Sequence, residues 1–334
     1  MFRFIILWIA SFATIFADDL VNSKAFNLIN AQDAYKQGIT GKGVNVGVVD
    51  SAINKNHISL RNKVGKELTS NLSNNGHGTH VGGIIAGERL DNTKPYGVAY
   101  NSMLYSRQIF GGPILPLGDF FTKNGVKIIN NSWNTIDINY AKHSNKDSNY
   151  FLRQASGRFY SKELYDLAQK NQTLLVFASG NQGIISSGVF SILPTFDENL
   201  RSIINIGALN ADGVFRDGNK LRITSQGAPT FSNSFLKSEN YSLMAFGVSI
   251  NSADGANVNG YRKATGTSMA APMVSGAAAL VAQKFPFLNG KQIADILLST
   301  ANKDYQAPKL VVKKSYQNGN KFSIAYIDNA PPPR

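Results

Sequence analysis

The chain has 334 residues, 43% hydrophobic and 16% charged, a composition that provides for a sizeable core and excludes a disordered chain. It contains no cysteine, which excludes disulfides, thiolate zinc sites and a cysteine nucleophile. The formal net charge of +13 is typical of chains that bind nucleic acid or an anionic membrane surface, and it can also serve solubility alone. No basic run with interleaved aromatic residues occurs, however, so we do not expect the chain to bind nucleic acid.

The first segment, Met1–Ala17, has the layout of a secretory signal peptide. One basic residue, Arg3, precedes an apolar run of 13 residues that ends at Phe16. This run is shorter than the roughly 20 residues of a membrane span, so an uncleaved anchor is kept only as an alternative. We expect cleavage after Ala17, with Ala13 as a second candidate, and no transmembrane span in the mature chain. The expected location is the periplasm, the cell surface or the medium.

The rest of the chain alternates between predicted strands and helices. Short Val- and Ile-rich runs without polar alternation are typical of strands buried on both faces of a parallel sheet. The segments between them include amphipathic or wholly apolar helical patterns. This alternation predicts an α/β fold, with a mostly parallel sheet and helices on both faces. The predicted strands are residues 43–50, 102–110, 126–133, 173–181, 202–209 and 242–250; the predicted helices are residues 161–171, 268–285 and 290–301.

Residues 18–304 contain no repeat and no Pro- or Gly-rich linker, so they are predicted to form a single domain. A polar stretch, residues 137–158, is interpreted as an inserted surface loop. Residues 305–334 shift to Lys and Asn and include three consecutive prolines. We expect this C-terminal extension to be a linker or extended spacer.

Asp50 stands at the end of the first predicted strand. Functional groups of open α/β sheets gather at the carboxyl ends of the strands. Taken alone, Asp50 would be interpreted as a helix cap or a turn residue. A phosphotransferase would need a second carboxylate two residues later, and position 52 is Ala.

The motif NGHGTHVGGIIAG, Asn75–Gly87, contains two of the four histidines. Histidine is the most frequent general base at neutral pH, and the glycines beside His77 leave room for a second group. His77 and His80 could in principle share a metal ion. No Glu follows His77 as in the H-E-x-x-H motif and the chain has no Cys, so no metal site is predicted.

The motif GTSMAAPMVSG, Gly266–Gly276, places Ser268 where a loop becomes a helix. The free N–H groups of a helix N-terminus favour negative charge, which would stabilise an oxyanion formed beside a serine nucleophile. On its own, Ser268 would be interpreted as an ordinary helix cap.

Together, these motifs resemble those of the subtilisin-like serine proteases, the subtilases. Asp, His and Ser occur in the order typical of that family, each within a longer matching segment. The matching segments are GVVDSAI around Asp50, NGHGTHVGGIIAG around His77, NNSW at Asn130–Trp133, ASGNQG at Ala178–Gly183 and GTSMAAPMVSGAAAL around Ser268.

The resemblance implies a subtilisin-like fold and an Asp–His–Ser triad. Ser268 would be the nucleophile, His77 the general base and then general acid, and Asp50 the group that orients His77. Asn181 would donate its side-chain amide to the oxyanion together with the Ser268 backbone N–H. A bound peptide would lie as an added strand. The residues implied to bind it are Ser132, Trp133, Asn134, Ala178, Ser179 and Gly180.

The sequence also departs from the family pattern. Ala52 replaces the usual Gly after the Asp–Ser pair, and about 25 residues before the first strand leave no room for a long propeptide. The insertion after NNSW resembles the subtilases that Gram-negative autotransporters carry as passengers. Such proteins continue into a stem and an outer-membrane barrel. A passenger fragment, a truncated product and a freestanding relative all remain open.

The leading hypothesis is therefore a secreted serine endopeptidase that acts on proteins or peptides and needs no cofactor for its chemistry. A catalytically inert subtilase-like protein that binds partners or adheres to surfaces is the alternative. A lipase or esterase is excluded, because its Ser would lie in G-x-S-x-G and precede its His.

We expect a monomer, and no Asp/Asn loop indicates where structural calcium would bind. Since residues 131–133 and 178–183 contain no acidic residue, apolar or aromatic side chains are expected before the scissile bond.

Overall fold

A computed structural model describes residues 22–68, 76–109, 117–134, 160–170, 173–184, 187–195, 197–235, 238–307, 310–317 and 320–327. The proposed signal peptide, the insertion at residues 137–158 and the three prolines near the C-terminus lie outside these residues. Among the residues described, no helix is both long enough and apolar enough to cross a bilayer.

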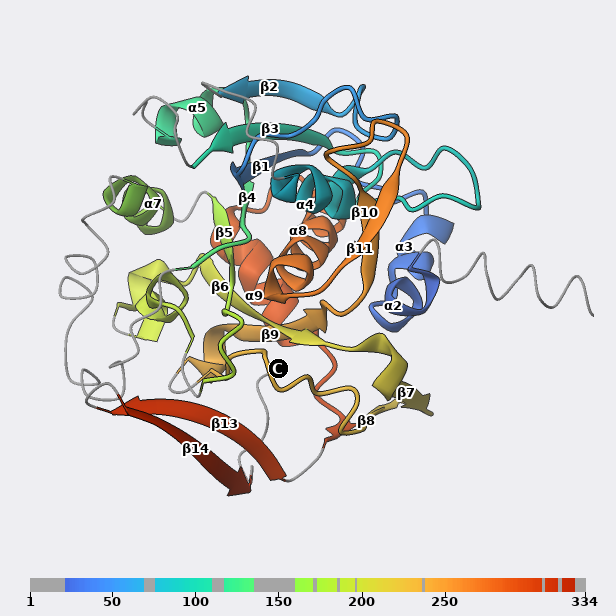
Figure 1. The fold of residues 1–334 in the computed structure, drawn as a ribbon. Coiled ribbons are helices and arrows are strands. Elements are labelled where there is room, and N and C mark those ends of the chain that lie inside the picture. The colour runs from blue at the N-terminus through green and yellow to red at the C-terminus, as the bar shows by residue number, and fades with distance from the viewer. Residues whose placement is uncertain are drawn as a thin grey trace, which may run out of the picture.

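A parallel sheet of seven strands forms the centre of the described part of the chain, in the order β2-β3-β1-β4-β5-β6-β9 (Figure 1). Six of these strands match the predicted ones, and β2 was not predicted. The mostly parallel sheet confirms the predicted fold class. The strands are β1 (Asn45–Asp50), β2 (Val64–Leu68), β3 (Met103–Gln108), β4 (Ile128–Asn131), β5 (Leu174–Ala178), β6 (Ile203–Leu209) and β9 (Ser242–Phe246).

Helices cover both faces of the sheet, as the alternating pattern predicts. Side chains alternate between the two faces along each strand, so Val48 belongs to one core cluster and Val49 to the other. The first cluster packs against α4 and α8, and the second against α5, α7 and the 3₁₀ helix η2. The helices are α2 (Ser23–Leu28), α3 (Ala31–Lys36), α4 (His77–Ala86), α5 (Leu117–Lys123), α7 (Tyr160–Gln169), η2 (Val189–Thr195), α8 (Thr267–Lys284) and α9 (Gly290–Thr300).

Three smaller sheets accompany the central one. The strands β10 (Ile250–Ala253) and β11 (Tyr261–Ala264) form an antiparallel pair. The antiparallel strands β7 (Val214–Asp217) and β8 (Lys220–Ile223) are joined by β12 (Tyr305–Gln306). Within the C-terminal extension, β13 (Leu310–Gln317) and β14 (Asn320–Ile327) form a hairpin, which the composition of that segment did not predict.

Candidate active site

The predicted Asp, His and Ser meet at the carboxyl end of the central sheet. Asp50 is the last residue of β1, which lies between β3 and β4. His77 and Ser268 lie in the first turns of α4 and α8, and these two helices pack against each other. The chain passes to opposite sides of β1 as it forms β3 and β4, and such a switch point is where open α/β sheets bind ligands.

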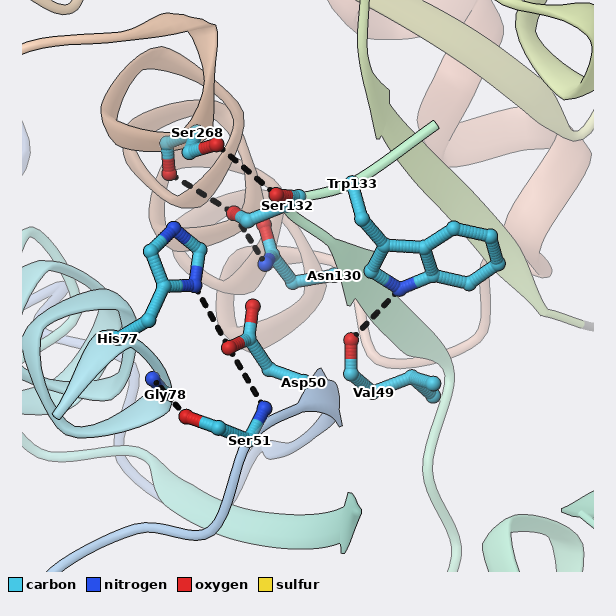
Figure 2. Close-up of polar contacts among 9 residues, drawn as sticks. All are labelled: Val49, Asp50, Ser51, His77, Gly78, Asn130, Ser132, Trp133 and Ser268. Carbon is cyan, nitrogen blue, oxygen red and sulfur yellow. Dashed lines mark hydrogen bonds and ion pairs between the residues drawn. The ribbon is translucent and has the colours of Figure 1, made fainter. Parts of the chain in front are cut away.

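Asp50 and His77 form a close hydrogen-bonded pair. The Nδ1 atom of His77 lies 2.7 Å from Oδ1 of Asp50, whose residue is 3% exposed (Figure 2). Burial lowers the pKa of His77, but the hydrogen bond to Asp50 and its negative charge outweigh this effect and raise the pKa above the ordinary value of 6.5. The pair therefore fixes the ring orientation and stabilises the imidazolium form.

A close approach of α4 to the end of β1 brings the two residues together. The N–H of Gly78 donates to the Ser51 hydroxyl oxygen at 2.8 Å, and the N–H of Ser51 donates to Oδ1 of Asp50 at 2.7 Å. A Cβ atom at position 78 would lie 2.0 Å from the Ser51 carbonyl oxygen. Glycine is therefore required directly after His77 for the imidazole to reach Asp50.

Ser268 is held to the end of β4 by two hydrogen bonds with Ser132. The Ser268 hydroxyl donates to the Ser132 carbonyl at 2.9 Å, and the Ser132 hydroxyl donates to the Ser268 carbonyl at 2.8 Å (Figure 2). The second bond compensates for Pro272, which lies four residues after Ser268 within α8 and has no N–H to donate to that carbonyl. The proline thus lets the start of α8 bond to β4.

A buried amide supports this contact from within the core. The Nδ2 atom of Asn130 donates to the Ser132 hydroxyl oxygen at 2.9 Å, and the Ser275 hydroxyl donates to Oδ1 of Asn130 at 3.0 Å. Asn130 and Ser275 are both 0% exposed. Both residues lie within motifs that the sequence analysis quotes, but only the packing of α8 against β4 reveals their contact.

Asn181 lies beside the start of α8 with its amide oriented by Thr267. Its Oδ1 atom accepts hydrogen bonds from the N–H of Thr267 at 2.8 Å and from the Thr267 hydroxyl at 3.0 Å. The amide NH₂ of this exposed residue is therefore the group that can donate to a ligand. The arrangement suits an oxyanion formed next to Ser268.

The six residues predicted to bind substrate lie just beyond the paired parts of β4 and β5. The pairing ends at Asn131 and Phe177, so residues 132–134 and 178–180 follow at adjacent strand ends. The ring of Trp133 turns away from Ser268 (Figure 2): its N–H donates to the Val49 carbonyl at 2.8 Å, and it packs edge-on against Phe177 and Phe190.

A second buried amide, Asn233, fixes the loop that carries Asn181. Its Oδ1 atom accepts from the N–H groups of Gln182 and Ile184, and its Nδ2 atom donates to the Ser179 carbonyl at 3.1 Å. Asn233 is 2% exposed and its own N–H donates to the Gly180 carbonyl at 3.0 Å. No sequence signal identified it, since it lies about 50 residues from this loop.

His80, the second histidine of the motif, is buried and does not face the surface beside Ser268 and His77. It is 0% exposed, and its Nε2 atom donates to the Arg262 carbonyl at 2.9 Å. Burial lowers its pKa to about 4, so the ring is neutral near pH 7. Within the described residues, no three His, Asp or Glu side chains gather as they would around a metal ion.

Comparisons with known proteins relate most of the chain to one family. The sequence profile of the subtilase family (peptidase S8) matches residues 41–322. Subtilisin DY from Bacillus licheniformis is 32% identical over 286 residues, which cover 82% of this chain and 89% of that protein. An extracellular serine protease from Serratia marcescens is 25% identical, and the match covers 82% of this chain but 31% of the longer relative. The structure of a cold-adapted subtilisin-like serine proteinase superposes with a TM-score of 0.55 at 22% identity, covering 79% of this chain and 84% of the other.

Proposed function

This chain belongs to the subtilase family of serine-type endopeptidases, and we propose that it hydrolyses peptide bonds through Asp50, His77 and Ser268. The observation that carries the proposal is the 2.7 Å hydrogen bond between Asp50 and His77 beside a serine at a helix N-terminus. The three residues come from distant parts of the sequence. Each has the chemistry that its proposed role requires.

In the first step, the Ser268 hydroxyl leaves the Ser132 carbonyl and its oxygen attacks the carbonyl carbon of the substrate. His77 accepts the hydroxyl proton at Nε2, while the negative charge of Asp50 stabilises the resulting imidazolium. His77 then protonates the leaving amine, and an acyl-enzyme on Ser268 remains. Water hydrolyses this ester with His77 again acting as the base, which restores the Ser268 hydroxyl.

The oxyanion of each tetrahedral intermediate would receive two hydrogen bonds. One donor is the Asn181 amide, which Thr267 orients by occupying its oxygen. The other is the Ser268 backbone N–H at the start of α8, where the helix dipole adds favourable partial charge. Removing one such donor typically raises the barrier by about 3–4 kcal/mol.

The substrate is proposed to be an extended protein or peptide segment. Ser132, Trp133 and Asn134 follow β4, and Ala178, Ser179 and Gly180 follow or end β5. Backbone groups at such strand ends can pair with an added strand, so main-chain hydrogen bonds would supply affinity with little dependence on sequence.

We extend the proposal to export and organisation. Met1–Ala17 would be removed as a signal peptide, residues 18–304 would form the peptidase domain and residues 305–334 a C-terminal extension. The product would be secreted to the periplasm, the cell surface or the medium, as a monomer. Amino-terminal sequencing of the protein recovered from culture would test this, because a start at Met1 contradicts it.

A relation to autotransporter passengers is the more specific form of this proposal. It rests on the length of chain between Asn134 and α7, which includes residues 137–158. Peptide mapping of the protein in its native cells would test it: fragments of a membrane-embedded C-terminal part support it, and a protein that ends with the sequence above contradicts it.

The proposed activity is tested by hydrolysis of a denatured protein and of peptide p-nitroanilides by the mature chain. Ser268→Ala should lose activity to near background and keep its fold, because covalent catalysis needs the hydroxyl. Ser299→Ala is the matched control, since it removes another helical hydroxyl, at an exposed position of α9. Equal turnover by Ser268→Ala and the control would contradict the triad. Lack of hydrolysis by every form would favour the inert alternative.

A further inference from the structure

The end of β4 is bridged to the end of β5 by one side chain, that of Asn134. The paired parts of the two strands end at Asn131 and Phe177. Three residues beyond this point, the Nδ2 atom of Asn134 donates to the carbonyl of Ala178 at 2.8 Å. The amide therefore spans the space between the two segments that are proposed to flank the substrate.

A third element completes the surroundings of this amide. The same Nδ2 atom also bonds to the hydroxyl oxygen of Ser191 on η2, a residue that is 0% exposed. Gly188, just before η2, leaves the room that the amide takes up, because a Cβ atom there would lie 2.0 Å from Cγ of Asn134. The amide is thus enclosed by β4, β5 and the segment that leads into η2.

We propose that Asn134 is a specificity-determining residue that limits the side chain before the scissile bond to small residues such as Ala, Ser or Gly. This inference rests on the proposed function and names the class of substrate for the same site. A small side chain fits above the amide without displacing it. A large aliphatic or aromatic side chain must push the amide away from Ala178 and Ser191.

The cost of that displacement sets the preference. Moving the amide breaks two hydrogen bonds and leaves a buried Ser191 hydroxyl and a strand-end carbonyl to find other partners. Differences of this kind in a side-chain pocket change kcat/KM by about 10- to 200-fold. Sequence analysis predicted apolar or aromatic residues before the scissile bond because no acidic residue lies in the flanking segments; the proposal narrows that prediction to small residues.

Three p-nitroanilide peptides that differ only in carrying Ala, Leu or Phe before the cleaved bond test the inference. The wild-type mature chain should cleave the Ala peptide at least about 10-fold faster, in kcat/KM, than the Phe peptide. Asn134→Ala should raise the ratio of kcat/KM for the Phe peptide to that for the Ala peptide at least about 10-fold. Asn45→Ala is the matched control, because it removes an amide that donates to the Asn124 carbonyl at 2.8 Å at the amino end of β1; it should leave the ratios unchanged.

The inference is overturned if the wild type prefers Phe, or if Asn134→Ala is active but its Phe-to-Ala ratio of kcat/KM equals that of the wild type. If Asn134→Ala does not fold, the wild-type ratio of Ala to Phe decides alone. A fluorophosphonate label distinguishes failure of the proposed function: a folded wild type that neither labels nor cleaves any of the three peptides overturns the proposed function and this inference together.

Discussion

The Ser268 carbonyl has no helical donor because Pro272 lacks an N–H, and the Ser132 hydroxyl donates to it instead. This contact yields a prediction about stability. Ser132→Ala removes the hydroxyl that donates to the Ser268 carbonyl and accepts from the buried Nδ2 atom of Asn130. Each buried polar group that loses its partner costs about 1–3 kcal/mol. Two such groups lose their partner, so we expect the free energy of unfolding to fall by about 2–6 kcal/mol.

Pro272→Ala provides a specific rescue of this loss. The new N–H at position 272 can donate to the Ser268 carbonyl, four residues before it, as in a regular helix. In the Ser132→Ala background it should therefore restore about 1 kcal/mol more than it does beside an intact Ser132. The intrinsic preference of the helix for Ala over Pro cancels in this comparison.

These changes form a double-mutant cycle of four proteins: one with neither change, one with each change alone and one with both. Their urea unfolding should be followed by circular dichroism and compared. All four should carry Ser268→Ala, which prevents self-digestion and leaves the Ser132 hydroxyl–Ser268 carbonyl bond in place. A coupling energy below about 0.3 kcal/mol, the scatter expected of independent sites, would refute the reasoning. It would mean that Ser132 does not compensate for the proline.

Three further predictions concern the site and its surroundings. Asn181→Ala should lower kcat about 10²- to 10³-fold with little change in KM; steady-state kinetics would contradict this if only KM changed. Because Asp50 raises the pKa of His77 and only the neutral ring accepts a proton, the acid limb of kcat/KM should lie above pH 6.5. Asp50→Asn should move that limb to lower pH and reduce kcat about 10⁴-fold; an unmoved limb would assign it to another group. His80 has a pKa of about 4 when folded and about 6.5 when unfolded, so protonation of the unfolded chain should reduce stability as the pH falls from 6.5 to 4, by about 3 kcal/mol. Urea unfolding should show a smaller decline for His80→Gln, and an equal decline would assign the effect elsewhere, for example to His57, whose pKa burial also lowers.

The residues that meet at the site could be predicted because their local signals are strong. Asp50 ends a Val-rich strand, and His77 and Ser268 stand in long motifs that resemble one family. Parallel strands bring their carboxyl ends to one edge of the sheet, so the meeting of these residues follows from the α/β pattern itself. The short apolar runs likewise predict six strands of the central sheet.

The contacts that shape the site could not be predicted in the same way, because they join segments far apart in the sequence. Ser275 bonds to Asn130 across 145 positions and Asn233 bonds to Ser179 across 54. Trp133 was predicted beside the substrate from its neighbours, yet its indole N–H finds the Val49 carbonyl and its ring packs between aromatic residues. The hairpin of β13 and β14 lies in a Lys- and Asn-rich segment whose composition indicates a spacer more readily than strands.

The most direct test of the central claim is to identify the residue that a fluorophosphonate probe modifies. The mature chain, labelled at neutral pH, would be digested and its peptides sequenced by mass spectrometry. The account predicts a single adduct on Ser268, absent from Ser268→Ala and slowed by Asp50→Asn. An adduct on another residue, in a chain that cleaves peptides, would contradict it.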